Sequence, residues 1–231
     1  MNIRGIQKTS LIDFPQVIST VLFTGGCNLR CLYCHNASLA CNDCNLQQYS
    51  NHEVLEFLQK RKHLIGGVVI TGGEPTLAKG IVTFLEKVKE TGLKVKLDTN
   101  GFQPKVLKKL LSQQLIDYVA IDIKTSPEKY PVLTKTKLPF DLIMESIALL
   151  KEHHITFELR TTCVPGFVTI EDLQSIKERV GTVKYYYLQQ FHNQHTLDES
   201  LHTVKPYPKD ILYSFQQFVK TFATFCEIRG I

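Results

Sequence analysis

The sequence lacks any apolar run of the ~20 residues that a helix needs to cross a bilayer. Its first residues, Met1–Lys8, lack the apolar core of a secretory signal peptide. Cysteine is scarce, and the seven cysteines are an odd number, which argues against a disulfide framework. We therefore expect a cytoplasmic protein with reduced thiols and without a membrane partner.

Basic residues are numerous but do not cluster. The formal net charge is +5, and the Lys and Arg residues are scattered over the predicted helices. Because nucleic-acid binding depends on a clustered basic patch, we do not expect a nucleic-acid partner. With 43% hydrophobic and 21% charged residues, the composition is ordinary for a globular protein that buries a sizeable core.

Short β-branched or apolar runs alternate with amphipathic stretches along the chain. We expect strands at 17–23, 67–71, 95–99, 118–122, 156–162 and 183–189, and helices at about 51–64, 79–91, 104–113, 140–153, 170–180 and 209–225. Six strand–helix units with short connections predict an α/β fold with a parallel sheet and helices outside. Right-handed crossovers would curl this sheet into an open partial (β/α)6 barrel.

No stretch resembles an interdomain linker, so we expect one domain over residues 1–231. Residues 1–16 form an N-terminal lead-in, where Pro15 and the polar residues before it predict an extended or turning segment. Residues 191–208, before the last helix, are polar and irregular and are suited to a lid or an interaction surface.

Three cysteines, Cys27, Cys31 and Cys34, follow the first predicted strand at spacings of four and then three. Thiolates are ligands that suit iron–sulfur clusters or zinc. Cysteine-bound clusters usually take four thiolates from short local spacings of this kind. Three cysteines in one loop would leave one iron of a 4Fe–4S cluster without a protein ligand, and an open iron is where chemistry can occur.

Other interpretations of this loop compete. Structural zinc would need a fourth ligand, such as His35, Cys41 or Cys44. The segment 31–35 also matches the C-x-x-C-H pattern of haem attachment, but that chemistry requires export and leaves one cysteine without a role. Cys41 and Cys44 form a further C-x-x-C, which could hold zinc or a shared cluster or remain free thiols; we expect no second cluster.

Polar residues follow every predicted strand, and active sites of such barrels form at the C-terminal ends of the strands. Beyond the cysteines, the residues at these ends are Gly72, Gly73, Glu74, Asp98, Asp122, Lys124, Arg160 and His192. Each alone has an ordinary structural explanation as a turn, a helix cap or a surface charge. Six segments that deliver such residues to one end of a sheet would be unusual by chance.

The C-x3-C-x2-C spacing, with an aromatic residue before the last cysteine, resembles the radical S-adenosylmethionine (SAM) superfamily. Together with the strand-end residues, it resembles the branch that activates glycyl radical enzymes. Lys8–Pro15 and Cys34-His35-Asn36 look like the activating proteins of anaerobic ribonucleoside-triphosphate reductase. The similarity extends from about residue 3 to residue 208.

This resemblance implies roles for the cysteines and the SAM site. Cys27, Cys31 and Cys34 would each ligate one iron of a 4Fe–4S cluster, and the amine and carboxylate of SAM would chelate the fourth. Tyr33 would lie against the adenine, and His192 would contact the nucleoside. The residues expected to hold the methionyl amine are Gly72, Gly73 and Glu74.

Three further positions carry implied roles. Lys124 would pair with the SAM carboxylate. Asp98 and Asp122 match positions that frame a monovalent cation in the pyruvate formate-lyase activating relatives. Asp13 matches a residue that touches the substrate backbone in those relatives.

The implied reaction begins when the reduced cluster donates an electron into the sulfonium C–S bond. It gives methionine and a 5′-deoxyadenosyl radical, which abstracts hydrogen from the Cα of a glycine in a partner protein. The implied partners are a glycyl radical enzyme, expected to be anaerobic ribonucleotide reductase, and a flavodoxin- or ferredoxin-type electron donor.

Two alternatives remain open from the sequence. One is a radical SAM enzyme that acts on a small molecule, such as a 7-deazaguanine precursor, although short members of that kind lack the Lys8–Pro15 lead-in. The other is a non-catalytic iron–sulfur or zinc protein, against which the residues at the strand ends argue.

Overall fold

The computed structural model describes residues 1–231 and contains one eight-stranded sheet, in which each strand lies beside its neighbour in sequence. The strands are β1 Ile3–Ser10, β2 Ser19–Thr24, β3 Gly67–Gly72, β4 Lys94–Thr99, β5 Tyr118–Asp122, β6 Thr156–Cys163, β7 Val183–Gln190 and β8 Ala223–Arg229. Strands β2 to β8 are parallel, and β1 is antiparallel to β2. No ladder joins β1 to β8, so the curved sheet remains an open barrel.

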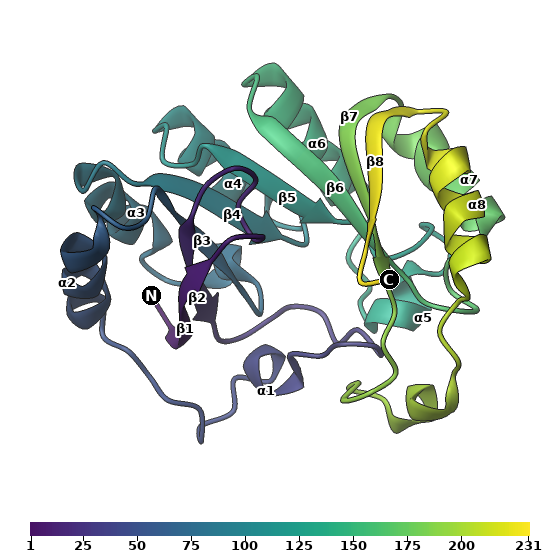
Figure 1. Ribbon diagram of the computed structural model, residues 1–231, viewed down its shortest axis with the longest axis horizontal. Coiled ribbons are helices and arrows are strands. Elements are labelled where there is room, and N and C mark those ends of the chain that lie inside the picture. The colour runs from purple at the N-terminus through teal and green to yellow at the C-terminus, as the bar shows by residue number, and fades with distance from the viewer.

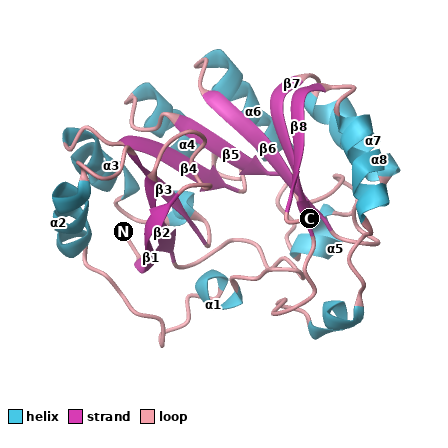
Figure 2. Cartoon of the chain, viewed as in Figure 1, coloured by secondary structure: helices cyan, strands magenta, loops and turns pink.

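The helices are α1 Ala37–Ala40, α2 Asn51–Arg61, α3 Ile81–Glu90, α4 Pro104–Ser112, α5 Tyr130–Thr134, α6 Asp141–Glu152, α7 Ile170–Val180 and α8 Lys209–Val219, with 3-10 turns at Pro75–Leu77 and Glu199–Thr203. The longer helices pack around the outside of this sheet, whereas the short helices α1 and α5 lie at its lower end in the view of Figures 1 and 2. None of the helices has the length and apolar character that a membrane-spanning helix requires.

Local signals in the sequence fix where the helices begin. Helix α2 starts at a capping box in which the Ser50 side chain accepts from the Glu53 amide while the Glu53 carboxylate accepts from the Ser50 amide. Thr169 and Asp172 form the same reciprocal pair at the start of α7. Each capping box fixes the residue at which its helix begins and thereby defines the loop between the preceding strand and that helix. The candidate site is built from loops of this kind.

The open α/β barrel and its six strand–helix units are confirmed, from β2 through the helix that follows β7. The lead-in contains more order than predicted, because residues 3–10 form the edge strand β1. Its residues Ile3 and Ser10 pair with Thr24 and Ser19 across a turn at 11–18.

The prediction for the C-terminus was wrong. The last helix ends at Val219, and the chain then turns to form β8, parallel to β7. The carbonyl of Phe222 accepts from the Val183 amide, which places the new strand on the sheet edge. The apolar residues of 222–226 continued the helical pattern in the sequence, but β-branched and aromatic residues there suit a strand.

Candidate active site

The carboxyl ends of the parallel strands surround a cavity of about 440 Å³. Its lining includes eleven of the predicted site residues: Cys27, Cys31, Tyr33, Cys34, Gly72, Gly73, Glu74, Asp98, Asp122, Lys124 and His192. The strand ends therefore converge as expected for such a barrel. Arg160, from β6, lines the same cavity.

Asp13 lies away from this cavity. It belongs to the turn between β1 and β2, at the opposite end of β2 from the cysteines, and accepts a hydrogen bond from the Ser10 hydroxyl. Its predicted contact with a substrate backbone therefore stays a prediction.

Main-chain hydrogen bonds from distant segments hold the cysteine loop in place. The amides of Arg30 and Leu32 donate to the carbonyls of Thr134 and Leu133 at the end of α5, each at 2.9 Å. The Leu32 carbonyl in turn accepts from the Asp198 amide, at 2.9 Å, in the irregular loop 191–208. The three cysteines are thus positioned by the protein itself.

Cys27, Cys31 and Cys34 all line the cavity, as the three protein ligands of one 4Fe–4S cluster would. No three His, Cys, Asp or Glu side chains converge as the ligands of one metal ion would. A 4Fe–4S cluster suits thiols spread around a cavity, since each cysteine binds a different iron. Burial raises the pKa of Cys27 to about 11 and that of Cys31 to about 12, so iron must displace their protons.

A buried hydroxyl at the cavity lacks a partner in the protein. Tyr33 is 6% exposed, and its hydroxyl makes no hydrogen bond. An unsatisfied buried polar group costs about 1–3 kcal/mol, so such a group usually has a partner. A polar ligand such as SAM, bound beside Tyr33, would supply one.

The two glycines after β3 have a packing role. Gly72 has φ +115°, and a Cβ on Gly73 would lie 2.2 Å from the carbonyl oxygen of Gly26. The amides of Gly73 and Glu74 donate to the carbonyls of Thr24 and Gly26, both at 2.8 Å. Glycine is required here because the turn packs directly on the entry to the cysteine loop, a reason that the sequence did not reveal.

The buried carboxylate of Glu74 connects the end of β3 to the end of β4 through hydrogen bonds. Its Oε1 accepts from the hydroxyls of Thr76 and Thr99, at 2.5 and 2.7 Å, and its Oε2 accepts from the Asn100 amide at 2.7 Å. Burial raises the pKa of this carboxyl, and the hydrogen bonds oppose that rise. The expected contact of Glu74 and its glycines with the SAM amine stays a prediction.

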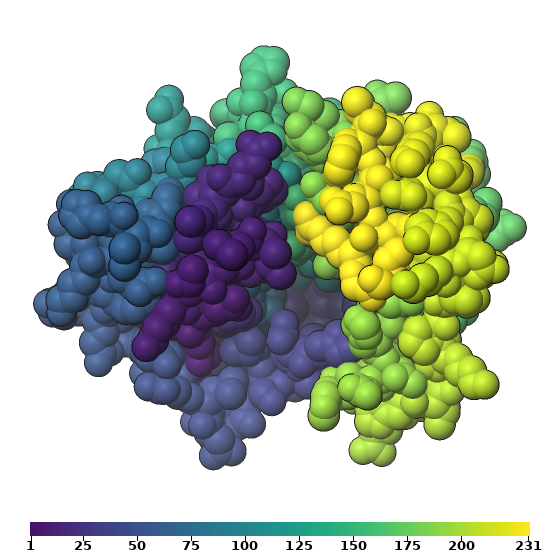
Figure 3. All heavy atoms as spheres, in the orientation of Figure 1, coloured from purple at the N-terminus to yellow at the C-terminus, as the bar shows by residue number.

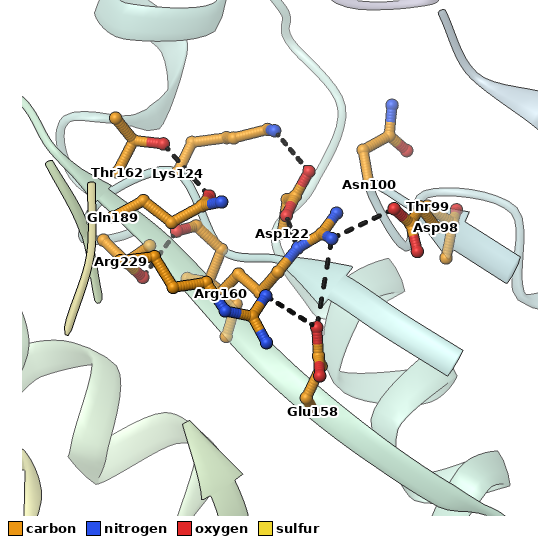
Figure 4. A network of polar contacts seen from close by, with 12 residues as sticks. Asp98, Thr99, Asn100, Asp122, Lys124, Glu158, Arg160, Thr162, Gln189 and Arg229 are labelled. Atoms are coloured by element: carbon orange, nitrogen blue, oxygen red, sulfur yellow. Dashed lines mark hydrogen bonds and ion pairs between the residues drawn. The ribbon is translucent and has the colours of Figure 1, made fainter. Parts of the chain in front are cut away.

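Arg160 bridges the two aspartates at the centre of the site (Figure 4). Its Nη1 lies 3.0 Å from Asp98 Oδ2, and its Nε lies 2.7 Å from Asp122 Oδ1. Lys124 Nζ is 3.0 Å from Asp122 Oδ2, and Lys96 Nζ is 2.6 Å from Asp98 Oδ1. Burial would raise the pKa of both aspartates, but these cations lower it below its usual range.

The expected monovalent metal ion does not fit this arrangement. All four carboxylate oxygens of Asp98 and Asp122 already contact a cationic nitrogen of a side chain. A metal ion between these residues would have to displace one of those nitrogens and would meet their positive charge.

Several residues of this network were missed from the sequence. Glu158 is fully buried inside the barrel and accepts from the Tyr118 hydroxyl at 2.9 Å and from Arg229 Nη1 at 3.3 Å. Lys96 could have been identified from strand alternation, since it lies two residues before Asp98 and therefore on the same face. Arg229 could not, because the predicted last helix ended at about residue 225 and no strand was expected after it.

The irregular loop 191–208 brings histidines to the edge of the cavity. The rings of His192 and His35 lie 6.4 Å apart, centre to centre, and His35 Nδ1 lies 3.1 Å from the Gln194 carbonyl oxygen. Burial lowers the pKa of His35, and the positive form of His192 would lower it further. The His35 imidazole is therefore suited to act as a neutral contact for a ligand.

Comparison with known proteins shows the family of the chain. The model of the radical SAM superfamily matches residues 21–180. A Methanocaldococcus jannaschii protein named as a glycyl-radical enzyme activating enzyme is 36% identical over 214 residues, covering 90% of this chain and 87% of its own. The pyruvate formate-lyase-activating enzyme of Clostridium pasteurianum is 32% identical over 152 residues, covering 63% and 62%.

Solved structures share the fold at low sequence identity. A radical SAM methyltransferase from Sphaerobacter thermophilus has a TM-score of 0.70 at 12% identity, over 96% of this chain and 70% of that one. Streptococcus suis SuiB bound to SAM has a TM-score of 0.66 at 15% identity, over 89% of this chain and 45% of that one. The chain belongs to the radical SAM superfamily and, within it, to the enzymes that activate glycyl radical enzymes.

Proposed function

We propose that this protein cleaves SAM reductively at a 4Fe–4S cluster and generates a glycyl radical on anaerobic ribonucleoside-triphosphate reductase. The observation that carries the proposal is the convergence of Cys27, Cys31 and Cys34 on the cavity that also holds Asp122 and Lys124. When bound, the reduced cluster would supply one electron, and SAM would supply the radical that takes the glycine hydrogen.

The chain's own residues would bind and orient these groups. The three cysteines would hold the cluster, and Lys124 would pair with the SAM carboxylate. Its ammonium is mostly buried, and burial alone would lower its pKa, but the contact with Asp122 raises the pKa of Lys124 well above its usual value and keeps it charged. A charge that is already oriented needs little reorganisation when the ligand binds, and correct placement of the reacting atoms is the main contribution of the protein.

An open side of the barrel suits a protein substrate. Strands β1 and β8 are the unjoined edges of the sheet, and Figure 3 shows a hollow between the purple N-terminal and the yellow C-terminal segments. Small substrates favour enclosed pockets, whereas an extended loop of another protein could enter through such an opening. Arg229 and Gly230, at the end of β8, line the cavity on this side.

The choice of partner rests on two supports. The relatives include proteins named as glycyl-radical enzyme activating enzymes and as pyruvate formate-lyase-activating enzymes. The Lys8–Pro15 and Cys34–Asn36 segments resemble the ribonucleotide reductase activating proteins, which favours the reductase over the lyase. The proposal includes a flavodoxin- or ferredoxin-type electron donor and a cytoplasmic location.

The test is electron paramagnetic resonance on anaerobic mixtures of the reconstituted protein, SAM, a reductant and a candidate partner from the same genome. We expect a glycyl doublet with the ribonucleotide reductase and none when the Cys31→Ala variant replaces the wild type. A doublet that appears only with a formate-lyase would overturn the choice of the reductase as the partner. Absence of any doublet, together with turnover of a small purine precursor, would overturn the proposal.

A further inference from the structure

A lysine lies inside the barrel behind the SAM site. The side chain of Lys96, on β4, is 1% exposed, and its Nζ lies 2.6 Å from Asp98 Oδ1 and 3.9 Å from Glu158 Oε1. Lysine is almost never fully buried unless its charge is paired. Lys96 is thus held in place by two carboxylates.

Lys96 contacts Asp98 without reaching the cavity. Alternation along β4 puts both side chains on the inner face of the sheet, and Asp98 lines the cavity whereas Lys96 does not. The ring of Tyr118, on the neighbouring strand, lies 5.8 Å from the ammonium and helps to enclose it. The ammonium therefore acts on the site through neighbouring side chains, chiefly Asp98, and does not itself reach the cavity.

The charges of the interior leave no place for a further cation. The network contains four cationic side chains, Lys96, Lys124, Arg160 and Arg229, and three carboxylates, Asp98, Asp122 and Glu158. Within this network the cationic side chains outnumber the carboxylates by one. A bound metal ion would double that excess in a buried site, where unpaired charge is costly.

We propose that the ammonium of Lys96 is a built-in monovalent cation that takes the place of a metal ion beside Asp98, so that this protein binds SAM without added Na⁺ or K⁺. Lys96 and Arg160 each take one oxygen of Asp98, which fixes and neutralises that carboxylate. Lys96 is a positioning residue in this role. The inference rests on the proposed function only in taking SAM as the ligand.

The first experiment measures SAM affinity by isothermal titration of the cluster-loaded protein in KCl, NaCl and choline chloride at constant ionic strength. We expect the wild type to bind SAM equally in the three salts. In choline, Lys96→Ala should bind SAM at least ~10-fold more weakly, because Asp98 loses a charged hydrogen-bond partner. KCl or NaCl should restore binding, since the truncated side chain leaves room for an ion.

Two matched variants distinguish the effect of losing the charge of Lys96 from the effect of losing its volume. Lys96→Met loses the charge but fills the space, so it should bind SAM weakly in all three salts without rescue by an ion. Lys89→Met removes an ion pair with Asp117 on a partly exposed surface and should behave as the wild type does. A fall in affinity for Lys89→Met as well would indicate a general effect of lost charge and would overturn the specific role of Lys96.

A second measurement does not depend on SAM. Thermal unfolding of the cluster-loaded, SAM-free proteins should show that K⁺ raises the midpoint of Lys96→Ala relative to choline but leaves the wild type unchanged. Wild-type binding that strengthens when Na⁺ or K⁺ is added, or a wild-type midpoint raised by K⁺, would overturn the inference. If the wild type bound no SAM in any salt, the proposed function would fail, whereas the unfolding comparison would still decide the role of Lys96.

Discussion

The guanidinium of Arg229 lies 3.5 Å from the centre of the Tyr187 ring, so the last strand is fastened to its neighbour by a cation–π contact. The same guanidinium donates to Glu158 at 3.3 Å. Glu158 therefore links β8 to the charged interior of the barrel. Its Oε1 also lies 3.9 Å from the nearest nitrogen of Lys96 and of Arg160, which connects it to the aspartates of the cavity.

Neutralising Glu158 should destabilise the protein strongly. Glu158→Gln leaves three cationic side chains without their shared, fully buried carboxylate, and breaking a buried ion pair in this way typically costs about 3–5 kcal/mol. Urea unfolding of the full-length protein measures this free energy. Glu178→Gln, on the exposed face of α7, is the control and should change it by less than about 0.5 kcal/mol. Equal effects of the two variants would contradict the network.

The two central aspartates predict how stability depends on pH. The pKa of Asp122 is lower in the folded protein than its unfolded value of about 3.9, so its contribution is fully present above that value and is lost as pH falls through the folded pKa. The difference in unfolding free energy between wild type and Asp122→Asn should stay constant from about pH 8 to pH 5 and shrink below about pH 4. A difference that shrinks between pH 8 and pH 6 would show that another group, such as a histidine, controls it.

Tyr33 offers a test of ligand binding that is separate from stability. Because its buried hydroxyl has no partner, Tyr33→Phe should leave the unfolding free energy of the SAM-free protein unchanged or raise it by up to about 1–3 kcal/mol. SAM affinity, measured by isothermal titration, should fall if the hydroxyl meets the ligand. Lower stability without SAM would mean that the hydroxyl already has a partner in the protein.

The cysteines of the loop and of the exposed pair should differ in their effect on iron content. Cys31→Ala should abolish the cluster and SAM cleavage, since this thiol supplies one iron ligand. The double change of Cys41 and Cys44 to Ser should leave about four irons per chain, consistent with one cluster. Both are exposed, as surface thiols outside the cluster site would be. Loss of roughly half the iron from the double variant would reveal a second cluster.

Strand alternation and one rule of topology made most of the site predictable. Residues such as Asp98 and Asp122 follow or end buried strands, and the carboxyl ends of parallel strands must meet at one edge of a sheet. No knowledge of side-chain packing was needed to place them together. The cysteine spacing then identified the chemistry.

The missed features depend on contacts between distant segments. Alternation places Lys96 on the same face as Asp98, but the burial of its ammonium follows only when the sheet curls and encloses that face. Residues 222–225 resemble the end of a helix until the edge of β7 offers them hydrogen bonds. The packing role of Gly73 exists only because Gly26, far away in the sequence, lies against it.

Asp13 is the one predicted site residue that lies outside the cavity. Its carboxylate accepts from Ser10, and the neighbouring Leu11 and Ile12 are 73% and 82% exposed in the same turn. A turn that presents large apolar side chains to solvent is suited to contact a protein partner. Asp13→Ala should therefore lower the yield of glycyl radical on the partner while leaving SAM cleavage without the partner unchanged.

The control is Ser10→Ala, which removes the same hydrogen bond but keeps the carboxylate of Asp13. If Asp13 contacts the partner's backbone, Ser10→Ala should retain most of the radical yield, measured by spin counting of the glycyl doublet. Equal losses in the two variants would show that only the shape of the turn matters. A fall in SAM cleavage without the partner would place the effect of Asp13 in the cavity, against the geometry of this turn.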